Sequence, residues 1–166
     1  MNIALIGFMG TGKTSVGRRV AERLGYKFVD LDEVIVDLAG QEIPAIFAEQ
    51  GEEYFRDLET KAVRQVVQTD KQVIATGGGV VLRSKNIKQL KAGGKVVLLK
   101  ASPEAIYQRT KNDDHRPLLE VEDPRAEIRR LLDKRRSAYD CTPHQIDTTE
   151  LTIEAVADKV IEIANR

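Results

Sequence analysis

Short apolar segments alternate along the whole chain with longer segments whose apolar residues recur at helical spacing, and this alternation is the strongest constraint on the fold. Nearly continuous apolar strands are typical of a parallel sheet that is buried on both faces. Because strands and helices alternate, we predict an α/β fold with a doubly wound sheet and right-handed crossovers. The predicted strands lie at residues 3–7, 27–31, 72–76, 95–100 and, with a weaker pattern, 145–147.

Three of the predicted helices have an N-terminal signal. Ser102-Pro103 and Asp123-Pro124 each place a side chain that can cap a helix before a proline, which suits the first helical turn. Thr152 is expected to open the last helix in the same way. These signals divide the second half of the chain into separate helical units.

The composition limits the number of domains and the class of protein. The 166 residues fit one domain, 1–166, which can bury ~70% of its unfolded surface without disulfides. Because 26 basic residues balance 26 acidic ones, we expect no nucleic-acid or anionic-membrane partner. No apolar run approaches the ~20 residues of a membrane helix, and the lone Cys141 excludes an internal disulfide. The chain begins without a cationic leader, so we expect a cytoplasmic monomer.

Residues 7–14, Gly-Phe-Met-Gly-Thr-Gly-Lys-Thr, match the phosphate-binding pattern G-x-x-x-x-G-K-[ST] in full. The motif follows a predicted strand and opens a predicted helix. Its glycines let backbone N–H groups converge on phosphate oxygens, and the helix adds its positive end. Lys13 is expected to bridge the terminal phosphates, and the Thr14 hydroxyl to bind Mg²⁺. The alternative is a glycine-rich turn with a solvated lysine, but the strand and helix around the motif favour a nucleoside triphosphate site.

The remaining sequence narrows the class of nucleotide-binding protein. A regulatory GTPase is expected to show a guanine-selecting N-K-x-D motif, and this motif does not occur. A motor or AAA-type ATPase is normally larger. We therefore predict a small kinase that moves the γ-phosphoryl group to a second substrate.

Two carboxylates, Asp30 and Asp32, lie two residues apart at the end of the second predicted strand. Strand alternation can direct both to the same side, at the sheet edge where ligands of α/β proteins bind. One carboxylate could hold Mg²⁺ through water while the other accepts a hydroxyl proton. The alternative is a helix cap, with Asp32 starting the next helix and Asp30 as its exposed neighbour.

A run of three glycines, 77–79, follows the third predicted strand. Three consecutive glycines cost conformational entropy on folding, so their presence needs a reason. One interpretation is a flexible turn. The other is a close approach between this backbone and a ligand, with N–H groups left to donate.

Arg135 falls in register with the apolar residues of its predicted helix, so its guanidinium is expected to face inward. A buried charge needs an anionic partner, which is either a protein carboxylate or a carboxylate of the substrate. Arg56 is a second candidate, with Glu59 one helical turn further on, where it could orient the guanidinium.

Two segments interrupt the alternation of strands and helices. Residues 32–60 are predicted to contain two short helices and a longer one between the second and third strands, more than a crossover requires. Residues 111–123 are mostly polar and are either an ordinary surface loop or a mobile lid. In a lid, Arg116 could close over the transferring phosphoryl group.

Taken together, these motifs and their separations resemble the shikimate kinases, a family of the nucleoside monophosphate kinase structural class. The resemblance spans nearly the whole chain. It implies a three-layer αβα fold with five parallel strands in the order 2-3-1-4-5. It also implies a substrate-binding subdomain near 32–60, a lid near 111–123 and an adenine loop near 147–150. The implied reaction transfers the γ-phosphoryl group of ATP, with Mg²⁺, to the 3-hydroxyl of shikimate in aromatic amino-acid biosynthesis.

Position by position, the resemblance implies roles for individual residues. Lys13, Asp32 and Arg116 correspond to the catalytic residues, with Asp32 as the candidate base. The residues implied in ATP binding are Gly10, Thr11, Gly12, Lys13, Thr14, Ser15, Arg109 (stacking on adenine) and Arg116. Those implied in shikimate binding are Asp32, Phe47, Phe55, Arg56, Gly77, Gly78, Gly79 and Arg135. Thr14 and, through water, Asp30 correspond to residues that hold Mg²⁺.

Two alternatives remain at this point. The chain could be another small-molecule kinase of the same fold, such as a gluconate or nucleoside monophosphate kinase. The triple glycine and Arg135 favour an acceptor with a carboxylate instead. The chain could also be a nucleotide-binding module without catalysis, although such a module has no need for Asp32, Arg56 and Arg135.

Overall fold

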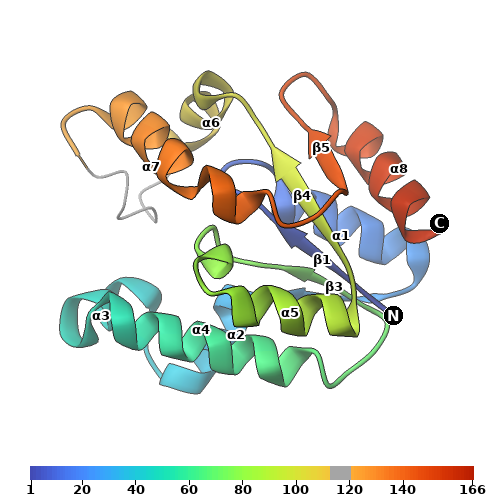
Figure 1. Cartoon of the computed structure of the whole chain (residues 1–166), viewed down its shortest axis with the longest axis horizontal. Coiled ribbons are helices and arrows are strands. Elements are labelled where there is room, and N and C mark those ends of the chain that lie inside the picture. The colour runs from blue at the N-terminus through green and yellow to red at the C-terminus, as the bar shows by residue number, and fades with distance from the viewer. Residues whose placement is uncertain (113–120) are drawn as a thin grey trace.

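A parallel five-stranded sheet forms the centre of the computed structural model, which describes residues 1–112 and 121–166 (Figure 1). The strand order is β2-β3-β1-β4-β5, as the family resemblance implied. Each predicted strand is present, and its ends differ from the prediction by at most one residue. The strands are β1 (Asn2–Ile6), β2 (Lys27–Asp30), β3 (Gln72–Ala75), β4 (Gly94–Lys100) and β5 (Gln145–Asp147).

Helices cover both faces of the sheet, which confirms the three-layer αβα architecture (Figure 1). One apolar core joins α1 and α8 to the sheet, and the other joins the opposite face to α4, α5, α6 and α7. Alternate residues of one strand enter opposite cores, so a buried strand is apolar throughout. These helices are α1 (Lys13–Leu24), α4 (Glu52–Val66), α5 (Ser84–Gly93), α6 (Pro103–Thr110), α7 (Pro124–Tyr139) and α8 (Ile153–Ala164).

The predicted N-terminal signals act as helix caps. The Ser102 hydroxyl accepts a hydrogen bond from the backbone N–H of Ala105 at 3.1 Å, and Thr152 caps α8 in the same manner. Asp123 accepts from the N–H of Ala126 at 3.2 Å at the start of α7. Side-chain acceptors thus satisfy backbone donors that a helix leaves open.

The segment between β2 and β3 contains the two short helices and one longer helix that the sequence predicts. They are α2 (Leu31–Ala39), α3 (Ile43–Gln50) and α4, which pack together at one end of the molecule (Figure 1). A short 3₁₀ helix, η1 (Val80–Leu82), follows the triple glycine. Residues 113–120, which include Arg116 and most of the predicted lid, lie outside the described residues. In the described part of the chain, no helix is long and apolar enough to cross a membrane.

Gly17 allows α1 to pack closely on the sheet, and α1 begins at the phosphate-binding loop. A Cβ on Gly17 would lie 2.8 Å from Cε2 of Phe28 and 3.4 Å from Cδ1 of Leu5. The helix therefore has a glycine at a position where alanine would favour helix formation by ~1 kcal/mol. Close packing of α1 on β1 and β2 explains this glycine.

We predict that Gly17→Ala destabilises the protein by about 1–3 kcal/mol despite its better helix propensity, because the added methyl group overpacks the core. Urea unfolding measures this change. Glu22→Ala, on the exposed side of the same helix, is the matched control and should change stability by less than ~1 kcal/mol. Equal stability of Gly17→Ala and the wild type would contradict the packing argument.

Candidate functional site

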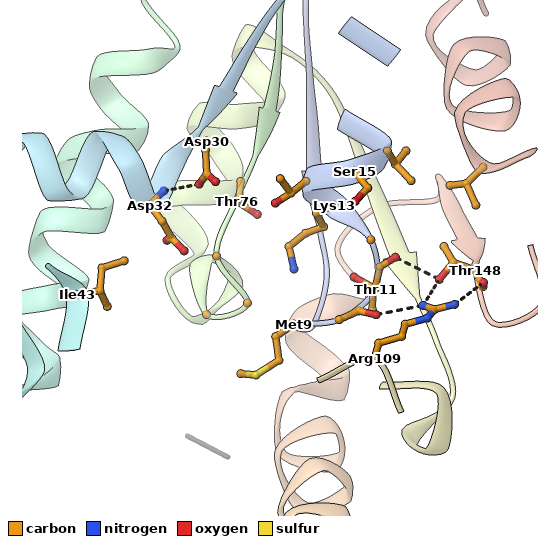
Figure 2. Close-up of a pocket in the computed structure, with 18 of the residues that line it drawn as sticks. Met9, Thr11, Lys13, Ser15, Asp30, Asp32, Ile43, Thr76, Arg109 and Thr148 are labelled. Carbon is orange, nitrogen blue, oxygen red and sulfur yellow. Dashed lines mark hydrogen bonds between the residues drawn. The ribbon is translucent and has the colours of Figure 1, made fainter. Parts of the chain in front are cut away.

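A cavity of about 820 Å³ lies at the carboxyl ends of β1, β2 and β3 (Figure 2). The loops that follow these three strands line it, together with residues of α3, α4, α6 and α7. The described residues to which the family resemblance gave individual roles all border this one cavity. These residues are Gly10, Thr11, Gly12, Lys13, Thr14, Ser15, Asp30, Asp32, Phe47, Phe55, Arg56, Gly77, Gly78, Gly79, Arg109 and Arg135.

The phosphate-binding loop connects β1 to α1 and lies directly against β4. A Cβ on Gly7 would lie 2.2 Å from the carbonyl oxygen of Leu99, so only glycine fits here. Gly12 caps α1 with a φ of 95°, a left-handed conformation that glycine adopts without strain. Lys13 Nζ donates hydrogen bonds to the carbonyls of Gly7 at 2.5 Å and Phe8 at 2.9 Å. The ammonium group is thus held within the loop.

Arg109 and Thr148 join the phosphate-binding loop to the segment after β5 (Figure 2). Arg109 Nη1 donates to the Gly10 carbonyl and to Thr148 Oγ1, both at 3.1 Å. The Thr148 hydroxyl also lies 2.9 Å from the Lys100 carbonyl oxygen and 3.2 Å from that of Thr11. The family resemblance implied only that this threonine belongs to an adenine loop, and no sequence signal identifies its contacts.

Asp30 and Asp32 both border the cavity, but the reason predicted for their placement is wrong (Figure 2). Asp30 ends β2 and caps α2, because its Oδ1 accepts a hydrogen bond from the Asp32 N–H at 2.9 Å. Asp32 is the second residue of α2, so a helical turn and not strand alternation directs its side chain. The alternative prediction, in which Asp32 starts the helix, is also wrong about the cap, which is Asp30.

Charged side chains closely approach the three glycines after β3. A Cβ on Gly79 would lie 2.2 Å from Arg56 Nη1. A Cβ on Gly77 would lie 3.3 Å from both Asp32 Oδ1 and Glu59 Oε2. The glycines therefore leave space for side chains of the protein itself, a reason that the sequence analysis did not consider.

Three charged residues lie buried around this glycine segment: Arg56 and Glu59 on α4, and Arg135 on α7. Arg56 Nη1 donates to Glu59 Oε1 at 3.0 Å, which confirms that Glu59 orients this arginine. Arg135 is 4% exposed, and within residues 1–112 and 121–166 no carboxylate forms an ion pair with it. Its inward orientation was predicted, and Glu59 interacts with it electrostatically without forming an ion pair.

Apolar and neutral groups complete this part of the cavity. The rings of Phe47 and Phe55 lie 4.7 Å apart, and the guanidinium of Arg56 lies over the second ring at 5.1 Å. Tyr139 donates its hydroxyl to the Gly78 carbonyl at 2.5 Å. Burial raises the pKa of the Tyr139 phenol, so it remains a neutral donor. These groups help to bury the charged side chains of Arg56 and Arg135.

Glu59 has a strongly shifted pKa. Burial raises it from 4.5 to about 7, and the Asp32 carboxylate adds to the increase. The Arg56 and Arg135 guanidiniums act in the opposite direction but do not offset the loss of hydration. Oε2 of this side chain has no hydrogen-bond partner among the described residues. A buried carboxyl near neutrality, facing a cavity, is typical of a functional site.

The donor set of the cavity suits a magnesium ion that is held mainly by phosphates. Thr14, Asp30 and Asp32 all line the cavity and offer hard oxygen ligands. No group of three or more His, Cys, Asp or Glu side chains that could form a metal cage occurs in the described part of the chain. Mg²⁺ is typically bound by one or two carboxylates together with substrate phosphates, so these residues fit that ion.

Comparisons with known proteins agree with the geometry. The shikimate kinase family model matches residues 9–165. A shikimate kinase of Thermodesulfovibrio yellowstonii is 52% identical over 161 residues, which span 97% of this chain and 93% of that protein. The solved shikimate kinase from Acinetobacter baumannii in complex with shikimate has a TM-score of 0.93 and 40% identity, covering 98% of this chain and 91% of that one. A gluconokinase from Sinorhizobium meliloti, with a TM-score of 0.64 and 17% identity, shares the fold, and the match covers 99% of this chain and 93% of that one.

The contact between Gly79 and Arg56 gives a direct test of the site's construction. We predict that Gly79→Ala destabilises the protein by about 2 kcal/mol, because moving Arg56 breaks its bond to Glu59 in a buried setting. Gly78→Ala is the matched control, since its nearest atom would be 3.5 Å away. Chemical denaturation should separate the two variants. Equal losses of stability would contradict this arrangement.

Proposed function

We propose roles in the reaction for individual residues of the cavity. The chain belongs to the shikimate kinase family, whose members are ATP-dependent kinases that act on shikimate. The observation that supports the proposal most is the buried Arg135, with which no carboxylate of the described residues forms an ion pair. Shikimate has one carboxylate and vicinal hydroxyls. One end of the cavity has the two arginines, which suit an anionic acceptor, and the other end has the phosphate-binding loop, which suits a nucleotide.

At the nucleotide end, the loop around Lys13 binds the phosphates of ATP. Its backbone N–H groups and the positive end of α1 face the phosphates, and Gly10, Thr11, Gly12 and Ser15 form this cradle. On ATP binding, phosphate oxygens replace the loop carbonyls as partners of the Lys13 ammonium group. Arg109 borders the adenine side, where its bonds to Thr148 hold it in place.

Thr14 and, through water, Asp30 hold Mg²⁺ in this proposal. When bound, the ion neutralises phosphate charge and so favours phosphoryl transfer. The bond from Asp30 Oδ1 to the Asp32 N–H fixes the start of α2. This turn therefore fixes the positions of both the Asp30 carboxylate, which holds the ion, and the neighbouring Asp32.

At the acceptor end, Arg56 and Arg135 grip the shikimate carboxylate. Arg56 is well prepared for this role, because Glu59 holds one side of its guanidinium while its Nε has no hydrogen-bond partner among the described residues. Phe47 and Phe55 face the apolar side of the ring, and the N–H groups of Gly78 and Gly79 are available to its polar groups. The carboxylate end of shikimate is thereby fixed away from the phosphates.

Asp32 binds the acceptor hydroxyls and takes the proton of the 3-hydroxyl as the hydroxyl oxygen bonds to the γ-phosphorus and the bond from that phosphorus to the oxygen of the leaving ADP breaks. Alignment and charge neutralisation provide most of the catalysis in phosphoryl transfer. Arg116 is assigned to the transferring phosphoryl group from the sequence alone. We further propose, on the basis of its balanced charge, that the protein has no nucleic-acid partner, and that it acts as a cytoplasmic monomer.

We predict that Asp32→Asn lowers turnover by ~10²–10⁴-fold while ATP binding changes little, because the amide cannot accept the hydroxyl proton. Coupled measurement of ADP release, with and without shikimate, gives the turnover. Asp37→Asn, on the exposed side of the same helix, is the control and should keep wild-type activity. A decrease below about threefold for Asp32→Asn would exclude Asp32 as the base.

A further inference from the structure

We propose that the Tyr139 hydroxyl fixes the orientation of the Gly78–Gly79 peptide, so that the Gly79 N–H faces the carboxylate of the acceptor. In this role Tyr139 is a positioning residue, which acts on the substrate through the backbone. The inference rests on the proposed binding of the shikimate carboxylate by Arg56, Arg135 and the glycine N–H groups.

The hydrogen bonds of the glycine segment, residues 77–79, differ between its carbonyl and N–H groups. The carbonyls of Gly77 and Gly79 accept hydrogen bonds from backbone N–H groups of η1 at 3.2 Å and 3.1 Å. The Gly78 carbonyl accepts its bond from the Tyr139 hydroxyl at 2.5 Å. By contrast, the N–H groups of Gly78 and Gly79 donate to no other group in the described part of the chain. The segment thus keeps its donors for a ligand while its carbonyls are already bound.

Tyr139 determines the direction of the Gly79 N–H through the geometry of the peptide bond. The bond between Gly78 and Gly79 is trans, so its C=O and N–H groups point in opposite directions. The carbonyl points to Tyr139 at the end of α7, and both glycines line the cavity. The Gly79 N–H therefore points away from the Tyr139 hydroxyl, and we place it toward the bound carboxylate.

The surroundings of the two glycines favour an anion. A Cβ on Gly79 would lie 2.2 Å from Arg56 Nη1, and a Cβ on Gly78 would lie 3.6 Å from Arg135 Nη1. Guanidinium groups from α4 and α7 thus approach the same short stretch of backbone. A carboxylate bound here receives charge-assisted hydrogen bonds from both side chains and backbone.

A segment of three glycines needs a restraint of this kind, because glycine has more accessible backbone conformations than other residues. Rotation of the Gly78–Gly79 peptide would turn its carbonyl oxygen toward the substrate carboxylate, and the two would repel each other. Tyr139 is 7% exposed and packs in the apolar core, which holds its hydroxyl in place. Arg135 lies one turn earlier on α7, so one helix positions a guanidinium and, through Tyr139, a backbone donor.

Tyr139→Phe removes the hydroxyl and keeps the ring in the core. We expect KM for shikimate to rise by ~10-fold, the effect of losing one hydrogen bond to a charged group, while kcat and KM for ATP change by less than about threefold. Steady-state measurement of ADP release with the full-length protein, at saturating ATP and then at saturating shikimate, gives these constants.

Thr142→Val is the matched control for the loss of a buried hydroxyl. Thr142 Oγ1 donates to the Val96 carbonyl at 2.8 Å, and this threonine is 5% exposed and outside the lining of the cavity. The variant should lower the melting temperature and leave KM for shikimate at the wild-type value. An equal rise of KM in Thr142→Val and Tyr139→Phe would show a loss of stability in place of a loss of positioning, and would overturn the inference.

An acceptor with a hydroxymethyl group in place of the carboxylate tests the route of the effect. Tyr139→Phe should lower kcat/KM for shikimate by ~10-fold but kcat/KM for this analogue by less than about twofold, because the analogue has no carboxylate for the Gly79 N–H to bind. Equal losses for the two acceptors would show that Tyr139 supports the site in general, contrary to the inference.

Nuclear magnetic resonance of the wild type gives a check that does not depend on the folding of a variant. Shikimate should shift the amide resonance of Gly79, and an unchanged resonance would overturn the inference.

The outcomes also separate the inference from the proposed function. If KM for shikimate rises in Arg135→Met but not in Tyr139→Phe, the role of Tyr139 is overturned and the proposed site remains. If it rises in neither variant, the proposed binding of the carboxylate is overturned, and the inference with it.

Discussion

Burial of charge next to a glycine backbone is the constraint on which the acceptor end of the site depends. Arg56, Glu59 and Arg135 are each at most 7% exposed, and charged groups lose strong hydration when they are enclosed in this way. The structure offsets part of that loss with the bond between Arg56 and Glu59. Gly79 is required because a side chain there would occupy the space of the Arg56 guanidinium, and a Cβ on Gly77 would lie 3.3 Å from an oxygen of Glu59.

The same constraint explains the division of the cavity. At the nucleotide end, backbone N–H groups and Lys13 face the charge of the ligand. Gly7 allows the phosphate-binding loop to lie against β4. At the acceptor end, rigid side chains from α4 and α7 supply the charge, and their helices pack in the core of the same sheet face. Neighbouring strand ends bring both sets together because the carboxyl ends of parallel strands meet at one edge. Phosphoryl transfer needs this alignment more than it needs covalent chemistry.

Much of this arrangement follows from the sequence, and the part that does not depends on contacts between distant segments. Continuous apolar runs predict the strands because both faces of a parallel sheet are buried, and the register of Arg135 with apolar residues predicts its inward orientation. The bonds of Thr148 and the approach of Arg56 to Gly79 have no sequence signal, since they arise only when separate elements pack. The direction of Asp32 was derived incorrectly because β2 ends two residues before it.

The central claim is that Arg135 is buried for the substrate and not for stability. Thermal unfolding and shikimate KM of Arg135→Met test it together, because methionine fills similar space without a charge. Because no carboxylate of residues 1–112 and 121–166 forms an ion pair with Arg135, removing the cation should leave the melting temperature unchanged or higher, while KM for shikimate rises by ~100-fold. A melting temperature that falls by several degrees with an unchanged KM would show that Arg135 serves a structural ion pair, contrary to this account.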